Sequence, residues 1–325
     1  MSGRAARRQA HGAPMPRGEE SDRVHGGRSM RAMLAGVLSQ YRAQLIVAEA
    51  GVVDDRDIEP LHQFRVAIRR TRALARRFGD CLDGRALTRF QSDFAWLAKA
   101  AGRQRDLDVL LERLDSERMP RLAAEPAAAL RAEIAERRRR AHGALLRVLS
   151  SARYRQLKVD WFHFLDEQRN SAAAPVPARE FAAASLSSDW DDLCRRAGRV
   201  GAGSRFKRLH ALRKDGKELR YALEAFSEVF GEEAIAALAR PLRRLQDDLG
   251  NLCDRHVQVQ MLGEMLSEHD SSDAAAPTSI ALRRWRRALR AELRSARQQV
   301  VKRCRKFGRK RNRRRFWKVL EEAAT

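Results

Sequence analysis

The stretch LHQFRVAIRRTRALARRF, residues 61–78, decides the fold because it carries two stripes at helical spacing. Members of each stripe are three or four residues apart, which keeps them on one side of an α-helix. The two stripes lie about 120° apart around that helix. The basic stripe comprises His62, Arg65, Arg69, Arg72 and Arg76, and the apolar stripe comprises Phe64, Ile68, Thr71, Ala75 and Phe78. We expect an amphipathic helix whose cations flank its buried face.

The pattern recurs in LHALRKDGKELRYALEAF, residues 209–226, where His210 aligns with His62 at an offset of 148 residues (210 minus 62). At the same offset the basic stripe continues and a second landmark also matches, a glycine followed four residues later by an aspartate. We interpret this landmark as a turn followed by a helix-capping aspartate. Two landmarks at one ungapped offset predict an internal duplication. The matched pairs are Arg65 with Arg213, Arg69 with Lys217, Arg72 with Arg220, Gly102 with Gly250, and Asp106 with Asp254.

The rest of the chain predicts an all-α fold, because apolar residues recur at helical spacing and strand signals are almost absent. We expect two pseudo-symmetric helical bundles flanking a basic groove or pore, over residues 29–320. Their halves would span about 29–168 and 186–318, joined by an Ala- and Pro-rich linker at 169–185. Residues 1–28 lack apolar periodicity and are predicted to form a disordered basic arm. Helices are predicted at about 85–101, 104–118, 125–151, 153–168, 188–200, 205–230, 232–249, 252–268 and 279–307.

Positive charge dominates the composition. Lys and Arg number 66 against 42 Asp and Glu, for a net charge of +24, which implies a polyanionic partner. The segment from Arg283 to Lys318 holds 18 basic residues and one acid, Glu292. The four cysteines form no ligand pattern, which favours a reducing compartment and predicts no zinc site. No apolar run is long enough to span a membrane and no secretory signal is visible, so we expect a cytoplasmic protein.

Four motifs in order resemble the CHAD family, named for a histidine in an α-helical domain. They are LHQFRVAIRRTRALARRF, WLAKAAGRQRDLDVLLERL, LHALRKDGKELRYALEAF and LRRLQDDLGNLCD, and the likeness covers about residues 30–318. The resemblance implies two helical bundles whose basic groove binds inorganic polyphosphate, often directing proteins to polyphosphate granules. It implies phosphate-binding residues at His62, Arg65, Arg69, Arg70, Arg72 and Arg76, and at His210, Arg213, Lys214, Lys217 and Arg220.

The resemblance also implies a non-enzymatic module, since the chain has no ExExK strand motif of the triphosphatase-like domain fused to some relatives. No catalytic residue, metal or cofactor is expected. The second copy has Glu224 where the stripe would place the counterpart of Arg76, so the groove is expected to be asymmetric. Arginine suits phosphate because its planar fork donates two parallel hydrogen bonds. Histidines at the head of both stripes predict that affinity rises on mild acidification.

Other interpretations stay open at this point. The stripes are also compatible with solvated charged faces. The C-terminal run KRCRKFGRKRNRRRFW is compatible with a solvated tail, an extended polyphosphate track, or nonspecific nucleic-acid binding in which Phe307, Phe316 and Trp317 stack on bases. A metal-dependent phosphohydrolase using the His and Asp landmarks is the third class, without a compact ligand motif to support it.

Overall fold

The computed structural model describes residues 29–116, 123–171, 178–270 and 276–322. Every element in these ranges is helical, as the sequence predicts, and the expected N-terminal arm lies outside them. The elements are α1 (Met30–Asp54), α2 (Glu59–Arg77), the 3-10 helix η1 (Gly79–Cys81), α3 (Gly84–Leu114), α4 (Ala124–Leu149), α5 (Ala152–Asn170), α6 (Ala178–Gly198), α7 (Phe206–Ala225), α8 (Ser227–Phe230), α9 (Glu232–Asp270), α10 (Pro277–Phe307) and α11 (Lys310–Glu322).

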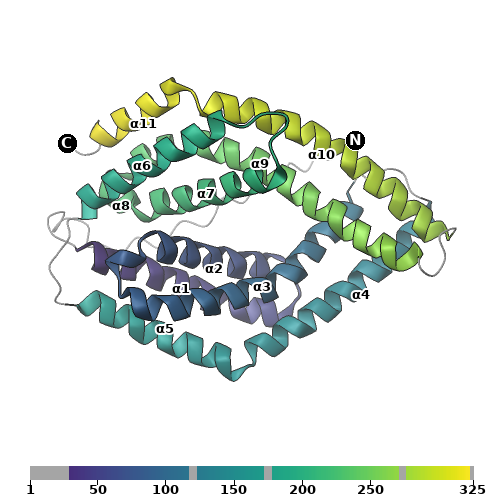
Figure 1. The fold of residues 1–325 in the computed structure, drawn as a ribbon. Coiled ribbons are helices and arrows are strands. Elements are labelled where there is room, and N and C mark those ends of the chain that lie inside the picture. The colour runs from purple at the N-terminus through teal and green to yellow at the C-terminus, as the bar shows by residue number, and fades with distance from the viewer. Residues whose placement is uncertain (1–28, 117–122, 172–177, 271–275, 323–325) are drawn as a thin grey trace, which may run out of the picture.

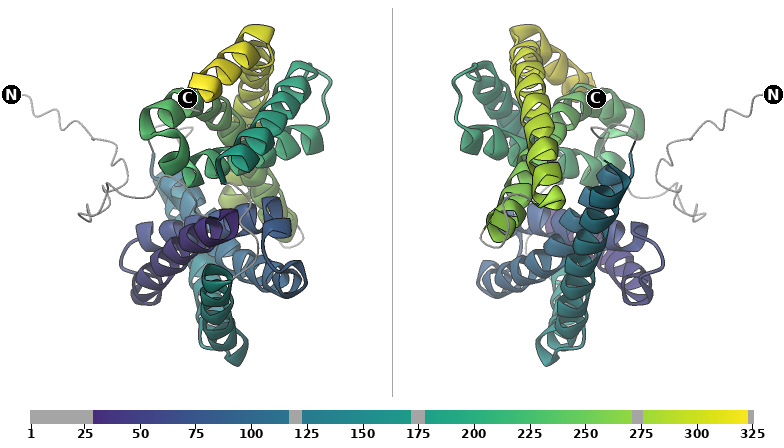
Figure 2. Two further views of the ribbon diagram at one scale, coloured as in Figure 1. Left: turned by 90° about the vertical axis from the view of Figure 1, so that its left-hand side faces the viewer. Right: turned by 90° about the vertical axis from the view of Figure 1, so that its right-hand side faces the viewer.

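The two halves of the chain lie one above the other, with α2 and α7 at the centre (Figure 1). Helices α1 to α5 form one half, and α6 to α11 form the other; the side views in Figure 2 show the same separation. Helix α2 begins with Glu59 in its first turn and Pro60 directly after it. Both suit a helix start, because Pro lacks an N–H that would be unpaired there and a carboxylate complements the dipole. The apolar stripe of α2 is buried, and so is the apolar side of α7, which consists of Leu212, Leu219, Leu223 and the following Phe226.

One continuous hydrophobic core joins the halves. It includes residues from both halves, and Phe78 meets Phe226 edge-on with ring centroids 5.2 Å apart. These two residues are equivalent under the offset of 148 (226 minus 78), so corresponding positions of the two halves touch each other. Each half therefore buries part of its apolar surface on the other half, and most of the stabilisation from that burial requires both.

A second, smaller core closes one end of the molecule. There the end of α3 and the helix α4 pack against the end of α9 and the start of α10, around Leu110, Ile134, Leu262 and Trp285. The long hairpins α3–α4 and α9–α10 thus meet away from the α2–α7 contact, at the right-hand side of Figure 1. The two cores together fix α2 and α7 relative to one another.

Two helices are longer than the sequence predicts. Helix α3 runs unbroken through Gly102, and α9 runs unbroken through Gly250, so the predicted turns at these glycines are wrong. A glycine inside a helix costs only about 1 kcal/mol relative to alanine, which favourable packing readily offsets. The predicted linker at 169–185 is also too long, because α6 begins at Ala178. Residues Ala182 and Leu186 are fully buried, which supplies the apolar face that extends this helix.

The C-terminal basic run is not a solvated tail. Its helix α11 buries Phe316 and Leu320, and the Phe316 ring stacks on Trp190 of α6 with centroids 4.2 Å apart. Phe307 and Cys304 are also buried, although the dense cations past Lys302 suggest a segment outside the core. Long basic side chains can cover apolar surface while their charged ends stay in water, so high charge does not prevent docking.

Among the described residues, no helix combines the length and apolar character that a bilayer crossing requires.

Candidate functional site

The basic stripes of α2 and α7 meet at the centre of the molecule. Arg70 Nη2 lies 3.0 Å from Glu224 Oε2 and Arg76 pairs with Glu218, and the C-terminal ends of both helices meet where Phe78 contacts Phe226. Arg69 donates a hydrogen bond to the Tyr221 hydroxyl. We call the cations at this contact the basic seam. Its members are Arg65, Arg69, Arg70 and Arg72 of α2, Arg213, Lys217 and Arg220 of α7, and Arg105 of α3.

The two landmark glycines lie beneath equivalent arginines of the seam. Arg65 Nη1 donates to the Ala101 carbonyl at 3.0 Å, and a Cβ on Gly102 would come within 3.2 Å of the same Nη1. In the second half, a Cβ on Gly250 would lie 3.8 Å from Arg213 Nε. A glycine lets a guanidinium lie directly across a helix backbone. The repeated contact agrees with the predicted duplication, which stays a prediction.

The landmark aspartates orient these arginines. Both lie inside long helices, so their predicted role as helix caps is wrong. Asp254 Oδ1 accepts from Arg213 Nη2 at 3.4 Å, and Asp106 interacts electrostatically with Arg65 and with Asp254. The two Gly–Asp landmarks of the sequence therefore come together in space, on the helices α3 and α9 beside the seam.

One end of the seam is partly neutralised, as the departure at Glu224 predicts. Glu224 binds Arg70 and lies 3.7 Å from Arg220 Nε. The guanidinium carbons of Arg69, Arg70 and Arg220 also lie 5.1–5.7 Å from the Tyr221 ring centroid, within cation–π range. These contacts hold the arginines in place without neutralising all of them.

Several guanidinium donors of the seam are buried and unpartnered. In folded proteins nearly all buried polar groups have a hydrogen-bond partner, and a missing partner needs an explanation. A charged donor left unpaired costs more than a neutral one. The atoms concerned are Arg70 Nε, Arg105 Nη1 and Arg213 Nε; Arg220 Nε likewise makes no hydrogen bond, although Glu224 lies 3.7 Å away. The arrangement supplies hydrogen-bond donors and positive charge where an anion would satisfy both.

Burial and mutual repulsion lower the pKa values of basic residues in the seam. Burial, together with the positive charges of Arg69 and Arg213, lowers the pKa of Lys217 to about 7; Asp254 opposes this shift. Burial likewise lowers the pKa of Arg65. A lowered pKa means that the surroundings disfavour the charged form of the side chain. An anion bound nearby would raise the pKa again. Perturbed cations of this kind are typical of functional sites.

The stripe histidines lie at different depths. His62 is half-buried, and burial followed by the charge of Arg105 lowers its pKa below the ordinary value. His210 and Lys214 are exposed on α7. Partial burial and the charge of Arg213 lower the pKa of His210 as well. Both shifts favour the neutral imidazole, so protonation of either histidine needs a lower pH than in an unfolded chain. The remaining stripe residue, Arg76, is exposed at its ion pair with Glu218.

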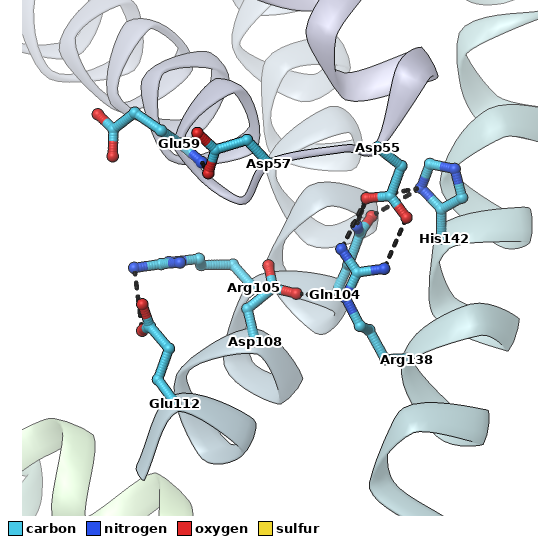
Figure 3. A network of polar contacts seen from close by, with 9 residues as sticks. All are labelled: Asp55, Asp57, Glu59, Gln104, Arg105, Asp108, Glu112, Arg138 and His142. Atoms are coloured by element: carbon cyan, nitrogen blue, oxygen red, sulfur yellow. Dashed lines mark hydrogen bonds and ion pairs between the residues drawn. The ribbon is translucent and has the colours of Figure 1, made fainter. Parts of the chain in front are cut away.

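Arg105 does not follow from the sequence pattern, because the duplication offset aligns it with Cys253 and not with a cation. Its neighbour Gln104 is fully buried and belongs to a polar network that locks α1, α3 and α4 together. In this network Arg138 binds both oxygens of Asp55 at 2.6 Å, and Asp108 at 2.7 Å. Figure 3 shows Arg105 pointing away from these contacts, with its Nη2 3.8 Å from Glu112 Oε2 of the same helix. The network thus fixes the backbone that presents Arg105 to the seam.

Within the described part of the chain, no three His, Cys, Asp or Glu side chains are grouped as ligands of one metal ion.

The chain is similar to proteins of one family. The family model of the CHAD domain matches residues 36–263. The crystal structure of the CHAD domain from the plant Ricinus communis is 24% identical; the match covers 88% of this chain and 97% of that chain, with a TM-score of 0.70. PptA from Streptomyces chartreusis is 19% identical, with coverage of 84% and 99% and a TM-score of 0.63. At these identities the likeness concerns the fold. No curated protein matches the sequence.

Proposed function

Because this chain belongs to the CHAD domain family, we propose that it binds inorganic polyphosphate through the basic seam. The observation that carries the proposal is the set of buried, unpartnered guanidinium donors that converge from α2, α3 and α7. Repulsion among these cations destabilises the free protein, and a bound polyanion would relieve it. These donor atoms are covered in the free protein, so the arginine side chains would have to turn toward the polymer, whose oxygens would then accept their hydrogen bonds.

Polyphosphate suits the seam chemically. It is a repeating anion with no bases, so a binder needs donors spread along a surface and no groups that read base edges. The arginines supply bidentate donors that remain charged at any working pH, and Lys217 adds a point charge. The helices α2 and α7 carry such donors on the sides that face each other, so that both helices can contact one polyphosphate chain. Asp106 and Asp254 would keep Arg65 and Arg213 oriented toward the ligand.

The proposed function is binding without turnover. The seam contains guanidinium donors and a lysine, with no nucleophile held beside a general base, which covalent phosphoryl transfer would need. We also propose that the protein accumulates in the cytoplasm on polyphosphate granules. A fluorescent fusion should co-localise with granules and disperse when the seam is neutralised. Incubation with polyphosphate, with and without Mg²⁺ or Mn²⁺, should release no phosphate; metal-dependent release lost in His62→Ala or His210→Ala would overturn this part.

The test of binding compares two variants in which three basic residues are each replaced by glutamine. The seam variant carries Arg65→Gln, Arg213→Gln and Lys217→Gln. The control variant carries Arg287→Gln, Arg290→Gln and Arg294→Gln, at exposed positions on α10. Affinity for fluorescent long-chain polyphosphate is measured at two salt concentrations, and circular dichroism checks that each variant is folded. We expect the affinity of the seam variant to fall at least tenfold. The affinity of the control should fall only by the smaller amount that the loss of positive charge causes anywhere on the surface.

Single-stranded DNA as a competitor separates polyphosphate binding from general polyanion binding. Equal losses in the two variants, with DNA competing equally at matched charge, would mean that the protein binds polyanions through its overall charge. Point substitutions are used instead of a deletion of residues 302–325, because Phe316 and Leu320 belong to the core and their removal would expose it.

A further inference from the structure

A second concentration of positive charge lies where α9, α10 and α11 meet. A surface pocket at this junction is floored by Pro241 and Phe307. We call it the C-terminal pocket. The cations that line it are Arg244 of α9, Arg303 and Lys306 of α10, and Arg309, Arg311 and Arg315 in and just before α11.

Most of these cations have no acidic partner. Arg303 Nε binds Asp248 Oδ2 at 2.6 Å. For the other five, no carboxylate of a described residue lies within ion-pair distance. The contrast within α11 is informative, because Arg313 pairs with Asp191 of α6, while Arg311 and Arg315 line the pocket. The helix thus uses one arginine to dock and leaves others free at the pocket, where like charges repel each other.

The walls of the pocket are held in fixed positions. Helix α10 ends at a glycine, Gly308, which packs on the backbone of Gly198; a Cβ at Gly308 would lie 2.7 Å from the Gly198 nitrogen. Asn312 Nδ2 then donates to the Phe307 carbonyl at 3.0 Å, which ties the first turn of α11 to the end of α10. The pocket therefore presents its cations in a defined arrangement instead of on a mobile tail.

The side chains around the pocket favour a ligand made of phosphate alone. Nucleic-acid binders that lack sequence preference combine basic grooves with exposed aromatic rings on which bases stack. Here Phe307 and Phe316 are buried in the protein core. Trp317 is 42% exposed, but it is not among the residues that line the pocket, and its side chain is hydrogen-bonded to Asp191 of α6. Condensed phosphate needs no stacking surface, only clustered donors and positive charge.

From these observations we propose that the C-terminal pocket is a second binding site for condensed phosphate, separate from the basic seam. This inference rests on the proposed function of the seam, since it assigns the same class of ligand to another part of the molecule. The α10–α11 junction lies on the opposite side of the C-terminal half from α2 (Figure 1). It also lies beyond residues 36–263, which the family model matches. One protein molecule would hold two polyphosphate segments that face different directions, and so would join separate chains.

The test uses the full chain and tripolyphosphate, which is too short to reach both sites. The pocket variant carries Arg309→Gln, Arg311→Gln and Arg315→Gln, all at exposed positions. The seam variant and the α10 control variant are those defined above, and each of the three variants replaces three basic residues with glutamine. Calorimetric titration at low salt should give two tripolyphosphates per protein for the wild type and the control, and one for each of the other variants.

The outcomes separate the two proposals. One tripolyphosphate per wild-type molecule, lost in the seam variant and kept in the pocket variant, would overturn the second site and leave the seam intact. A single bound tripolyphosphate that is lost only in the pocket variant would overturn the proposal that the seam is a binding site. No saturable binding would overturn both. With long-chain polyphosphate, light scattering should rise for the wild type and stay low for the pocket variant, because only a molecule with two sites joins chains.

Discussion

Lys217 illustrates how the seam lowers the stability of the free protein. Its pKa is lowered to about 7 by burial and by neighbouring arginines, whereas an unfolded chain would hold the lysine near its usual pKa of about 10.4. Between these two values the unfolded state binds more protons than the folded state. The free energy of unfolding should therefore rise with pH from about 7 to about 10, and the penalty is complete below pH 7.

The substitution Lys217→Met should thus stabilise the protein at pH 7 while weakening polyphosphate binding. Removing the repelled charge should raise Tm by about 2 °C, on the order of 1 kcal/mol for a domain of this size. Tm is measured from pH 6.5 to 10, and the gain should shrink toward the alkaline end. Lys214→Met, at an exposed neighbouring position, is the control. A loss of Tm in Lys217→Met at every pH would show that the lysine contributes packing and not repulsion.

The two landmark glycines allow a matched comparison. Gly250→Ala places its Cβ at an ordinary contact distance of 3.8 Å from Arg213, so it should stabilise α9 by about 0.5–1 kcal/mol through helix propensity. Gly102→Ala places its Cβ 3.2 Å from Arg65 Nη1 and must displace that guanidinium. It should gain less stability and bind polyphosphate more weakly. Chemical denaturation and polyphosphate titration check both; equal effects of the two substitutions would contradict the role of Gly102.

At the scale of elements, helix α11 is an integral part of the fold because its junction with α10 tolerates only glycine. Gly308→Ala would place a Cβ 2.7 Å from the backbone of Gly198, where no side chain can move aside. We expect Tm to fall by several degrees, with α11 exposed to proteolysis. Gly36→Ala in α1 is the control, since nothing lies within 4 Å of the added atom, and it should raise Tm slightly. A Gly308→Ala protein as stable as the wild type would show that α11 docks loosely.

The elements also show what sequence reasoning can recover. The apolar faces of α2 and α7 and the residues Trp285, Leu289 and Val300 of α10 were predictable, because their periodicity reports burial directly. The glycines 102 and 250 were misread because a glycine that ends a helix and one that admits an arginine look alike in sequence. The packing of α11 on the rest of the fold does not follow from the sequence. Its apolar residues Phe316 and Leu320 are sparse among many cations, and local charge density does not identify a helix far away in the chain on which they pack.

The residues of the basic seam were also predictable only in part. The stripes located the α2 and α7 members of the seam, since identical spacing in two copies marks equivalent surfaces. Arg105 was missed because it has no counterpart in the second half. Neither the pairing of Arg70 with Glu224 nor the contact of Arg69 with Tyr221 follows from periodicity, because each depends on how two distant helices cross.

At the scale of the whole molecule, the halves should unfold together. They share one core, and the second core at the far end of the hairpins also draws on both. Urea unfolding should give one transition whether it is followed at Trp161 in the N-terminal half or at Trp190 in the C-terminal half, using single-tryptophan variants. A fragment of residues 29–171 should not fold alone. Two separate transitions, or a folded fragment, would contradict a shared core.

The edge-on contact between Phe78 and Phe226 has a consequence for the origin of the chain. Equivalent residues touch each other only at a two-fold axis, which is the geometry of an isologous dimer interface. If the chain arose by duplication, the ancestral half would have exposed this surface and would have existed as a homodimer. Fusion of the two copies then allowed them to diverge, so that a carboxylate such as Glu224 arose in one copy only, a difference that identical subunits cannot carry.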